Sequence, residues 1–342
     1  MPYDGRFLCG LTFRRPRRGA LRAVAMAGIV GLATAMAGTA PAQAPYPTKP
    51  IRIVVGFAAG GPADIVARVV GAKVGDILGQ QVVIENRTGA GGAIATEAVA
   101  RAQGDGYTLL LSPLANAVNE TLIKDFRYKV GEQLLAVAPL AETANVLVVH
   151  PSLGVKSVSD LIALAKTKPD EMFYASAGRG TATHLTSELF NMMAGVKIVP
   201  VHYKGGGDTV RDLLSGQVKI MFSSIAPVLA FVKDGKLLGL ATTGPNRDAA
   251  LPELPTIAEA GLAGFDMRLW LGLLAPAGTP GPVIDRLSSA IAQSLNIPET
   301  KAALEAQGFS ALIGTPDQFD AFYRSEVAKW RKVIEATGMA AQ

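Results

Sequence analysis

The clearest chemical signal in the chain is a glycine pair between a buried-strand pattern and a helical pattern. The apolar run Ile51–Val55 leads to Gly60-Gly61, and apolar residues then recur at helical spacing as far as Leu78. The first N–H groups of a helix lack intrahelical partners, and the helix dipole is positive there. Such a turn attracts anions. The pattern therefore predicts a site that holds a small acidic molecule.

Asp64 lies in the first turn of that predicted helix, and its role has two interpretations. An acid at this position is stabilised by the helix dipole, which is sufficient to account for it. Asp64 could also accept a hydrogen bond from a ligand amine, a ligand hydroxyl or a water, because the few polar groups of a cleft orient its ligand. Both interpretations stay open at the level of the sequence.

Turns rich in Gly, Ser and Thr follow four further predicted strands. They lie at 176–184, 203–207, 223–224 and 242–244. Ligands of open α/β sheets bind at the carboxyl ends of the strands, so these turns predict a ring of N–H donors and hydroxyls. Ser112 and Asn116 follow another predicted strand, at 108–111. The cations Arg179 and Lys204 either contact an acidic ligand or lie in solvent.

Motifs for other chemistries are incomplete. The glycine-rich stretch 89–94 ends in Ile94 and lacks the acid of a dinucleotide fingerprint, and no P-loop string occurs. The histidines, His150, His184 and His202, do not have the spacing of metal ligands. We therefore expect neither a metal nor a cofactor. His184 either faces the cleft or satisfies local backbone.

A hydrolase remains as the enzymatic alternative. Ser176, His184 and Asp208 could be assembled into a triad, but no G-x-S-x-G elbow supports it. Ser176 would be the nucleophile of an exported α/β hydrolase. The absence of the elbow favours a binding protein over an enzyme.

The N-terminus predicts export. Arginines are frequent up to Arg22, an alanine-rich apolar stretch follows, and Ala42-Gln43-Ala44 fits a cleavage site. This order is typical of a signal peptide covering residues 1–44 and of a periplasmic mature protein. The apolar stretch is short for a membrane span, although an uncleaved anchor is an alternative. The arginine pairs leave both the Sec and the twin-arginine routes open.

Cleavage would change the charge and the cysteine content. Residues 1–44 hold six arginines and one aspartate, which leaves 27 basic and 27 acidic residues in the mature chain. A neutral balance gives no support to nucleic-acid binding. The lone cysteine, Cys9, is removed as well, so the mature chain has neither disulfides nor a catalytic thiol.

Strand and helix patterns alternate through the mature chain, which predicts parallel β-α-β units. A first block ends near Asn145, and a second block follows without a low-complexity linker. We therefore expect strands to cross directly between two domains, with a cleft between them. Ser157 and Asp160 predict a capped helix start, and Thr279-Pro280 and Thr315-Pro316 predict two more.

Eight strings in order carry a resemblance to a known family. They are YPTKPIRIVVGFAAGG, VVIENRTGAGG, DGYTLLL, YASAGRGTATHL, HYKGGG, LPELPTIAEAG, WLGLLAPAGTP and KWRKVIEATG, and they span residues 46–338. Together they resemble the substrate-binding receptors of tripartite tricarboxylate transporters, the Bug receptors. The resemblance implies an α/β, two-domain, periplasmic-binding-protein-like fold (Venus flytrap, type II) with a ligand cleft between the lobes. The expected domains are 46–145 with 275–342, and 146–274.

The resemblance also implies a function. The chain is expected to capture a small organic acid and to present it, as a monomer, to inner-membrane transporter subunits. A receptor that signals to a sensor kinase is the alternative. The residues expected to contact the ligand are Phe57, Ala59, Gly60, Gly61, Asp64, Ser112, Asn116, Ser176, Gly178, Arg179, Gly180, Thr181, His184, Tyr203, Lys204, Gly205 and Ser223.

The sequence departs from the family pattern in three places. Ala59 replaces the proline of the F-A-P-G-G loop, and Arg179 occupies the variable place of the S-A-G-x-G-T loop. The segment 124–137 has no counterpart of the N-P-x-L-Y stretch. These departures lie in the walls of the expected cleft, so the sequence does not identify the ligand.

Overall fold

The computed structural model describes residue 10 and residues 46–124, 126–178, 180–203 and 206–338. The chain divides into a unit Met1–Tyr46 and a compact unit Pro47–Gln342, and the description below concerns the second. Apart from Gly10, the predicted signal peptide lies outside the described residues. Within them, no helix combines the length and the apolar character that crossing a membrane requires.

The first sheet is mixed. Its parallel strands run in the order β2-β1-β3, and β9 then pairs antiparallel with both β3 and β4. A short strand, β10, pairs with β4. The strands are β1 (Ile51–Val55), β2 (Val82–Asn86), β3 (Thr108–Pro113), β4 (Leu134–Val149), β9 (Arg268–Pro276) and β10 (Ser310–Ala311).

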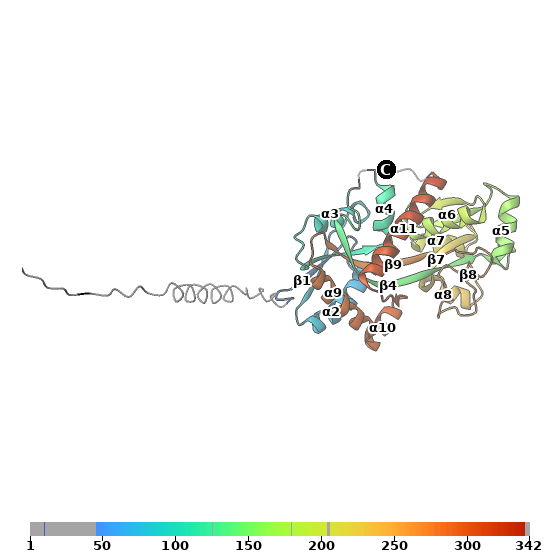
Figure 1. Ribbon diagram of the computed structural model, residues 1–342. Helices are drawn as coiled ribbons and strands as arrows, with labels where there is room; N and C mark the ends of the chain where they lie inside the picture. The colour runs from blue at the N-terminus through green and yellow to red at the C-terminus, as the bar shows by residue number, and fades with distance from the viewer. Residues whose placement is uncertain (1–9, 11–45, 125, 179, 204–205, 339–342) are drawn as a thin grey trace, which may run out of the picture. The chain divides into compact units, whose positions relative to one another are not determined.

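The helices beside this sheet follow from the amphipathic patterns. α2 ends where Gly79 takes the left-handed conformation, with φ 69°, as its place after the last apolar residue predicts. α2, α9 and α10 pack on one another, and α11 packs on α4, β4 and α6 (Figure 1). These helices are α2 (Pro62–Leu78), η1 (Ala90–Gly92), α3 (Ala93–Ala100), α4 (Leu114–Leu122), α9 (Gly281–Asn296), α10 (Pro298–Glu305) and α11 (Pro316–Thr337).

The second sheet continues from the far half of β4. Its order is β4-β7-β5-β6, with β8 also paired to β4. The strands are β5 (Phe173–Ser176), β6 (Val199–His202), β7 (Ile220–Ser224) and β8 (Leu238–Thr242). Their helices are η2 (Pro151–Leu153), α5 (Val158–Thr167), α6 (Ala182–Ala194), α7 (Gly206–Leu214) and α8 (Ile225–Lys233).

One strand joins the two sheets. β4 pairs with β9 as far as Ala144 and with β7 and β8 from Asn145 onward. The expectation of a strand that crosses directly between two blocks is therefore confirmed. The sequence predicts a strand only for residues 146–149, which form the end of β4. Its first half contains Pro139, which is tolerated because the pairing with β9 shifts register there.

The three predicted helix starts have different outcomes. Thr315 forms a full capping box with Gln318, and Ser157 accepts a hydrogen bond of 3.1 Å from the N–H of Asp160. The prediction that Thr279 caps a helix is wrong. Its hydroxyl donates to the carbonyl of Pro276 at 2.8 Å, and α9 begins only at Gly281.

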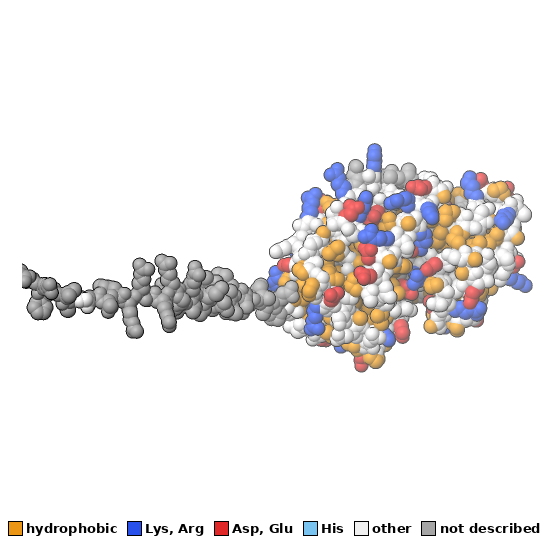
Figure 2. Space-filling model, in the orientation of Figure 1, with side chains coloured by type: hydrophobic (Ala, Val, Ile, Leu, Met, Phe, Trp, Pro, Cys, Tyr) orange, Lys and Arg blue, Asp and Glu red, His pale blue; other side chains and the backbone are white. Residues whose placement is uncertain are grey.

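A continuous apolar core spans elements from both sheets, including Leu110, Leu147, Phe222 and Trp270. A second cluster includes Val146 of β4, Met221 of β7 and Val228 of α8. On the face drawn in Figure 2, basic and acidic side chains are interspersed, without a large area of one sign. This arrangement agrees with the neutral charge balance of the sequence after residue 44.

Candidate ligand-binding cleft

A cavity of about 670 Å³ lies between elements of the two sheets. From the first sheet it is lined by the turn after β1, η1, the start of α4, β9 and the turn before β10. From the second sheet it is lined by the starts of α6 and α8, and Thr143 contributes from β4. Its volume lies within the range that small-molecule sites occupy.

Four helices begin at this cavity. Pro62 and Ala63 of α2, Leu114 and Ala115 of α4, Ala182 of α6, and Ile225 and Ala226 of α8 all line it. None of the four N-cap residues, Gly61, Pro113, Thr181 and Ser224, caps its helix with a side-chain hydrogen bond. The positive dipole ends of four helices therefore lie at one space, and apart from Pro62 and Pro227 the lining residues of their first turns carry backbone N–H groups.

The turn between β1 and α2 is held by Asp64. One carboxylate oxygen accepts from the N–H of Gly60 and from Arg68 Nε, both at 2.9 Å. The other accepts from Arg68 Nη2 at 2.9 Å and from Asn86 Nδ2 at 3.0 Å, and Asn86 also donates to the carbonyl of Phe57. Hydrogen bonding to Arg68 lowers the pKa of Asp64 to about 2, so this anchor stays charged at neutral pH.

The turn between β5 and α6 is held by its own polar groups. Thr181 Oγ1 donates to the carbonyl of Gly178 at 2.6 Å, and Ser176 Oγ donates to the same carbonyl at 3.0 Å. The N–H of Gly180 donates to His184 Nδ1 at 3.1 Å. Gly178 and Gly180 have φ values of 134° and 71°, which favour glycine. These contacts fix the turn at the cavity wall.

The two sides of the cavity approach each other at two points. A Cβ placed on Gly180 would lie 3.3 Å from Leu122 Cδ2, which joins the β5–α6 turn to α4. A Cβ placed on Gly308 would lie 4.0 Å from the Cβ of Ala226, which joins the turn before β10 to α8. Elements of the two sheets are thus close enough for a ligand to contact both.

Three of the predicted ligand residues line the cavity: Phe57, Gly180 and Thr181. Arg179, Lys204 and Gly205 lie outside the described residues. The other predicted residues are not among those that line it and are Ala59, Gly60, Gly61, Asp64, Ser112, Asn116, Ser176, Gly178, His184, Tyr203 and Ser223. Direct ligand contact by these residues stays a prediction.

Several of them have partners within the protein. Asp64 is 2% exposed and its four hydrogen bonds position the β1–α2 turn. Asn116 Nδ2 donates to Thr96 Oγ1 at 2.8 Å, while its buried Oδ1 has no partner among the described residues. His184 is buried, with its ring 4.8 Å from that of His202. These contacts favour positioning roles.

The expected ring of turns is only partly present. The turns at 176–184 and 223–224 reach the cavity, whereas 242–244 and the described residues of 203–207 do not line it. Thr243 instead accepts from the N–H of Asn145 at 2.8 Å and donates to the carbonyl of Met267 at 2.7 Å. Two helices that follow strands of the first sheet, α2 and α4, also begin at the cavity.

Sequence reasoning did not find Asn119 or Trp270 as lining residues, and it included Ser224 only as part of the turn 223–224. Ser224 directly follows the predicted Ser223, so its signal was present. Asn119 lies about one helical turn beyond Asn116 on α4. Trp270 begins the string WLGLLAPAGTP, but only the fold shows that β9 passes the cavity.

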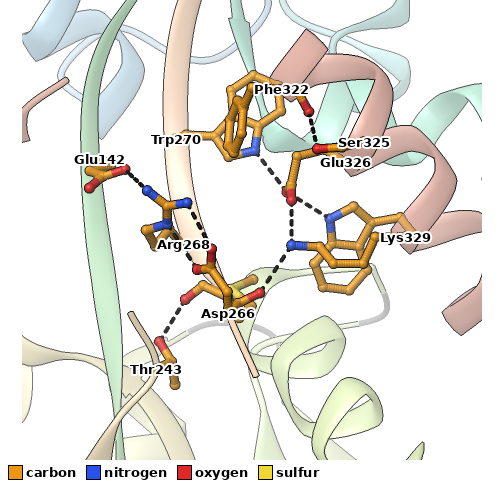
Figure 3. A network of polar contacts seen from close by, with 11 residues as sticks. Glu142, Thr243, Asp266, Arg268, Trp270, Phe322, Ser325, Glu326 and Lys329 are labelled. Atoms are coloured by element: carbon orange, nitrogen blue, oxygen red, sulfur yellow. Dashed lines mark hydrogen bonds and ion pairs between the residues drawn. The ribbon is translucent and has the colours of Figure 1, made fainter. Parts of the chain in front are cut away.

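A polar network holds β9 in place behind the cavity (Figure 3). Arg268 binds Glu142 of β4 at 2.6 Å and Asp266 at 2.8 Å. Glu326 of α11 accepts from Trp270 Nε1 at 3.0 Å and from Trp330 Nε1 at 3.1 Å. Lys329 contacts Glu326 and donates to the carbonyl of Asp266 at 3.0 Å. β4, β9 and α11 are thereby tied together where the chain passes between the sheets.

Comparison with known proteins decides the family. The sequence matches the family model described as "Tripartite tricarboxylate transporter family receptor" over residues 66–339. The chain belongs to this family. The protein BugT of Bordetella pertussis is 39% identical to this receptor over 316 residues, which cover 91% of this chain and 96% of BugT.

Solved structures agree with the fold. The receptor resembles Rhodopseudomonas palustris Rpa4515 with adipate, with 34% identity, a TM-score of 0.71, and 86% of this chain and 99% of that chain covered. It also resembles MatC of Rhodopseudomonas palustris with bound malate, with 30% identity, a TM-score of 0.68, and 84% and 100% covered. The prediction of a two-domain periplasmic-binding-protein-like fold is confirmed.

The same comparisons place the receptor among solute-binding proteins, not enzymes. The geometry of Ser176 agrees with this placement. Its side chain is fully buried, and its hydroxyl lies 3.1 Å from Nδ1 of His202, whereas Asp208 binds Arg211. The imagined triad of Ser176, His184 and Asp208 is not assembled. The family acts in the periplasm, so membership implies export of this chain.

Proposed function

We propose that this receptor captures a small organic acid in the cavity between its two sheets. The observation that carries the proposal is the convergence of four helix N-termini without side-chain caps on one space. A carboxylate placed there accepts hydrogen bonds from backbone N–H groups and is stabilised by the dipoles. Adipate and malate in the two Rhodopseudomonas structures support the ligand class.

Binding would bring the two sheets together. α2 and α4 belong to the first sheet, and α6 and α8 to the second, so a ligand held by both sets stabilises a closed arrangement. The proposed lobes are residues 46–145 with 275–342, and residues 146–274. β9 pairs entirely within the first sheet, so the return crossing would precede Arg268, several residues ahead of the boundary expected at 274.

The closed receptor would then deliver the acid, as a monomer, to transporter subunits in the inner membrane. The family name supports a transporter partner. Cleavage after Ala44 by a signal peptidase would release the mature receptor into the periplasm. The mature chain has balanced charge, so docking would depend on local shape and charge rather than on a strong net field.

A thermal-shift panel tests the proposal. Purified mature receptor is heated with mono-, di- and tricarboxylates, acidic amino acids and aromatic acids, each at millimolar concentration. A ligand that binds only the folded state raises Tm, by an amount corresponding to about 2.7 kcal/mol at one hundred times its Kd. At least one acid is expected to do so in a saturable manner. If no acid in the panel raises Tm, the proposal is wrong.

A further inference from the structure

The walls of the cavity are apolar on both sides. Leu122 contributes from α4, Leu185 from α6 and Ile225 from α8, while Phe57, Trp270 and Phe309 contribute aromatic rings from three separate segments. Among the described residues that line the cavity, none carries a charged side chain. Burial of apolar surface against such walls is favourable, at roughly fourfold in affinity for each methylene group.

Besides Trp270, the described lining residues include five with polar side chains, of which Asn119, Thr143 and Thr181 make hydrogen bonds within the protein and Ser224 and Gln307 are the other two. Asn119 Nδ2 donates to the carbonyl of Gly91 at 3.0 Å, and Thr181 Oγ1 donates to the carbonyl of Gly178 at 2.6 Å. Thr143 Oγ1 donates to the carbonyl of Ala144 at 3.4 Å. A ligand hydroxyl that enters the cavity would therefore lose its hydrogen bonds to water and find few hydrogen-bond partners on the walls. A buried hydroxyl without a hydrogen bond lowers the affinity of the ligand.

The helix N-termini and the apolar walls suit different parts of a ligand. The backbone N–H groups suit a carboxylate, and the remaining surface suits an apolar chain or ring. We infer that the ligand is an organic acid with an apolar body, aliphatic or aromatic, without hydroxyl or amine groups. This inference rests on the proposed function and names the ligand class for the same site.

Two pairs of acids with equal carbon number and charge provide the test. Hexanoate and gluconate are six-carbon monoacids, and adipate and galactarate are six-carbon diacids, so each pair differs only in its hydroxyl groups. Calorimetric titration of the mature receptor is expected to show at least about tenfold tighter binding of the apolar member in each pair that binds.

Two variants connect the preference to the cavity wall. Leu122→Asn places an amide in the wall at a partly exposed position, and is expected to weaken hexanoate or adipate about fivefold to tenfold while affecting the hydroxylated acid less. Ile313→Asn makes the same kind of change at a side chain 45% exposed that does not line the cavity. It is expected to leave both affinities unchanged.

The outcomes separate this inference from the proposed function. Equal or tighter binding of gluconate and galactarate overturns the apolar-body inference and leaves the carboxylate receptor intact. An equal effect of Leu122→Asn on both members of a pair also contradicts it. If none of the four acids binds and the wider acid panel also fails, both the inference and the proposed function are wrong. If only hydroxylated or amino acids in that panel bind, the inference alone fails.

Discussion

Asp64 accepts a hydrogen bond of 2.9 Å from the backbone N–H of Gly60, four residues earlier in the chain. The side chain of Asp64 does not line the cavity, but through this contact it anchors the β1–α2 turn, which does line the cavity. Arg68 and Asn86 complete the anchor from α2 and β2. The position of Phe57 at the cavity therefore depends on a buried carboxylate behind it.

Asp64→Asn is expected to loosen this turn. The amide keeps the shape but loses the ion pair with Arg68 and one acceptor, which lowers the free energy of unfolding by about 1–2 kcal/mol at pH 7. The pKa of Asp64 is lowered in the folded state, so its contribution is present above its unfolded pKa and is lost as pH falls towards about 2. Urea unfolding at pH 7 and pH 2.5 measures both values. A difference between wild type and variant that persists undiminished at pH 2.5 would contradict this account.

Glu120→Gln is expected to stabilise the receptor at high pH. Burial raises the pKa of Glu120 to about 7, against the opposing charge of Lys129. The folded state therefore retains the proton longer than the unfolded state, and wild-type stability falls as pH rises from about 4.5 to 7. The variant does not lose this stability. At pH 8 its free energy of unfolding is therefore expected to exceed that of the wild type by up to about 2 kcal/mol, after allowance for partial solvent exposure.

Unfolding of both proteins at pH 4.5 and pH 8 checks this sign. The gain is expected at pH 8 and absent at pH 4.5. Glu253→Gln, at an exposed position, is the control and is expected to give no gain at either pH. A Glu120→Gln variant that is equally stable relative to wild type at both pH values would show that Glu120 is not perturbed.

Gly180→Ala is expected to impair binding more than stability. A methyl group there meets Leu122 at 3.3 Å, and φ is 71°. Gly235→Ala is a matched control, because φ is 72° and nothing lies within 4 Å of the added Cβ. Both variants carry a backbone cost of about 1 kcal/mol. Calorimetry should show weaker ligand binding only for Gly180→Ala, and equal binding by the two variants would refute a role of the Gly180–Leu122 approach.

Trp270→Phe and Trp330→Phe form a second matched pair. Both indoles donate to the same oxygen of Glu326, and both are buried, but only Trp270 lines the cavity. Each variant should lose about 2–3 kcal/mol of stability through the lost hydrogen bond and the reduced packing. Ligand affinity should change for Trp270→Phe alone. A comparable affinity change in Trp330→Phe would mean that the effect passes through general destabilisation.

The sequence was most predictive where local chemistry decides the structure. Gly79 ends α2 and Thr315 begins α11 as their residue types require. It was less predictive where distant pairing decides. The first half of β4 contains Pro139 and overlaps the segment 124–137, which lacks the family pattern. Its strand character therefore depends on pairing with β9, more than a hundred residues later in the chain.

The site divides in the same way. Phe57, Gly180 and Thr181 were expected from the family resemblance, and they lie in strand-to-helix turns, which have a sequence signature. Leu122, Trp270 and Phe309 have none, since apolar residues at regular spacing resemble ordinary core. Only the fold reveals that such residues meet at one cavity. Conversely, Asp64 has the appearance of a ligand contact in the sequence, and its full set of partners is visible only in three dimensions.

The central claim is that helix N-termini bind a carboxylate in this cavity. The most direct measurement is calorimetric titration of the mature receptor with the acid that most raises Tm, and with the primary amide of the same acid. The amide keeps the size and body of the ligand but lacks the charge that the helix dipoles stabilise. The acid is expected to bind about one hundredfold more tightly. An amide that binds as tightly as its acid would contradict the claim.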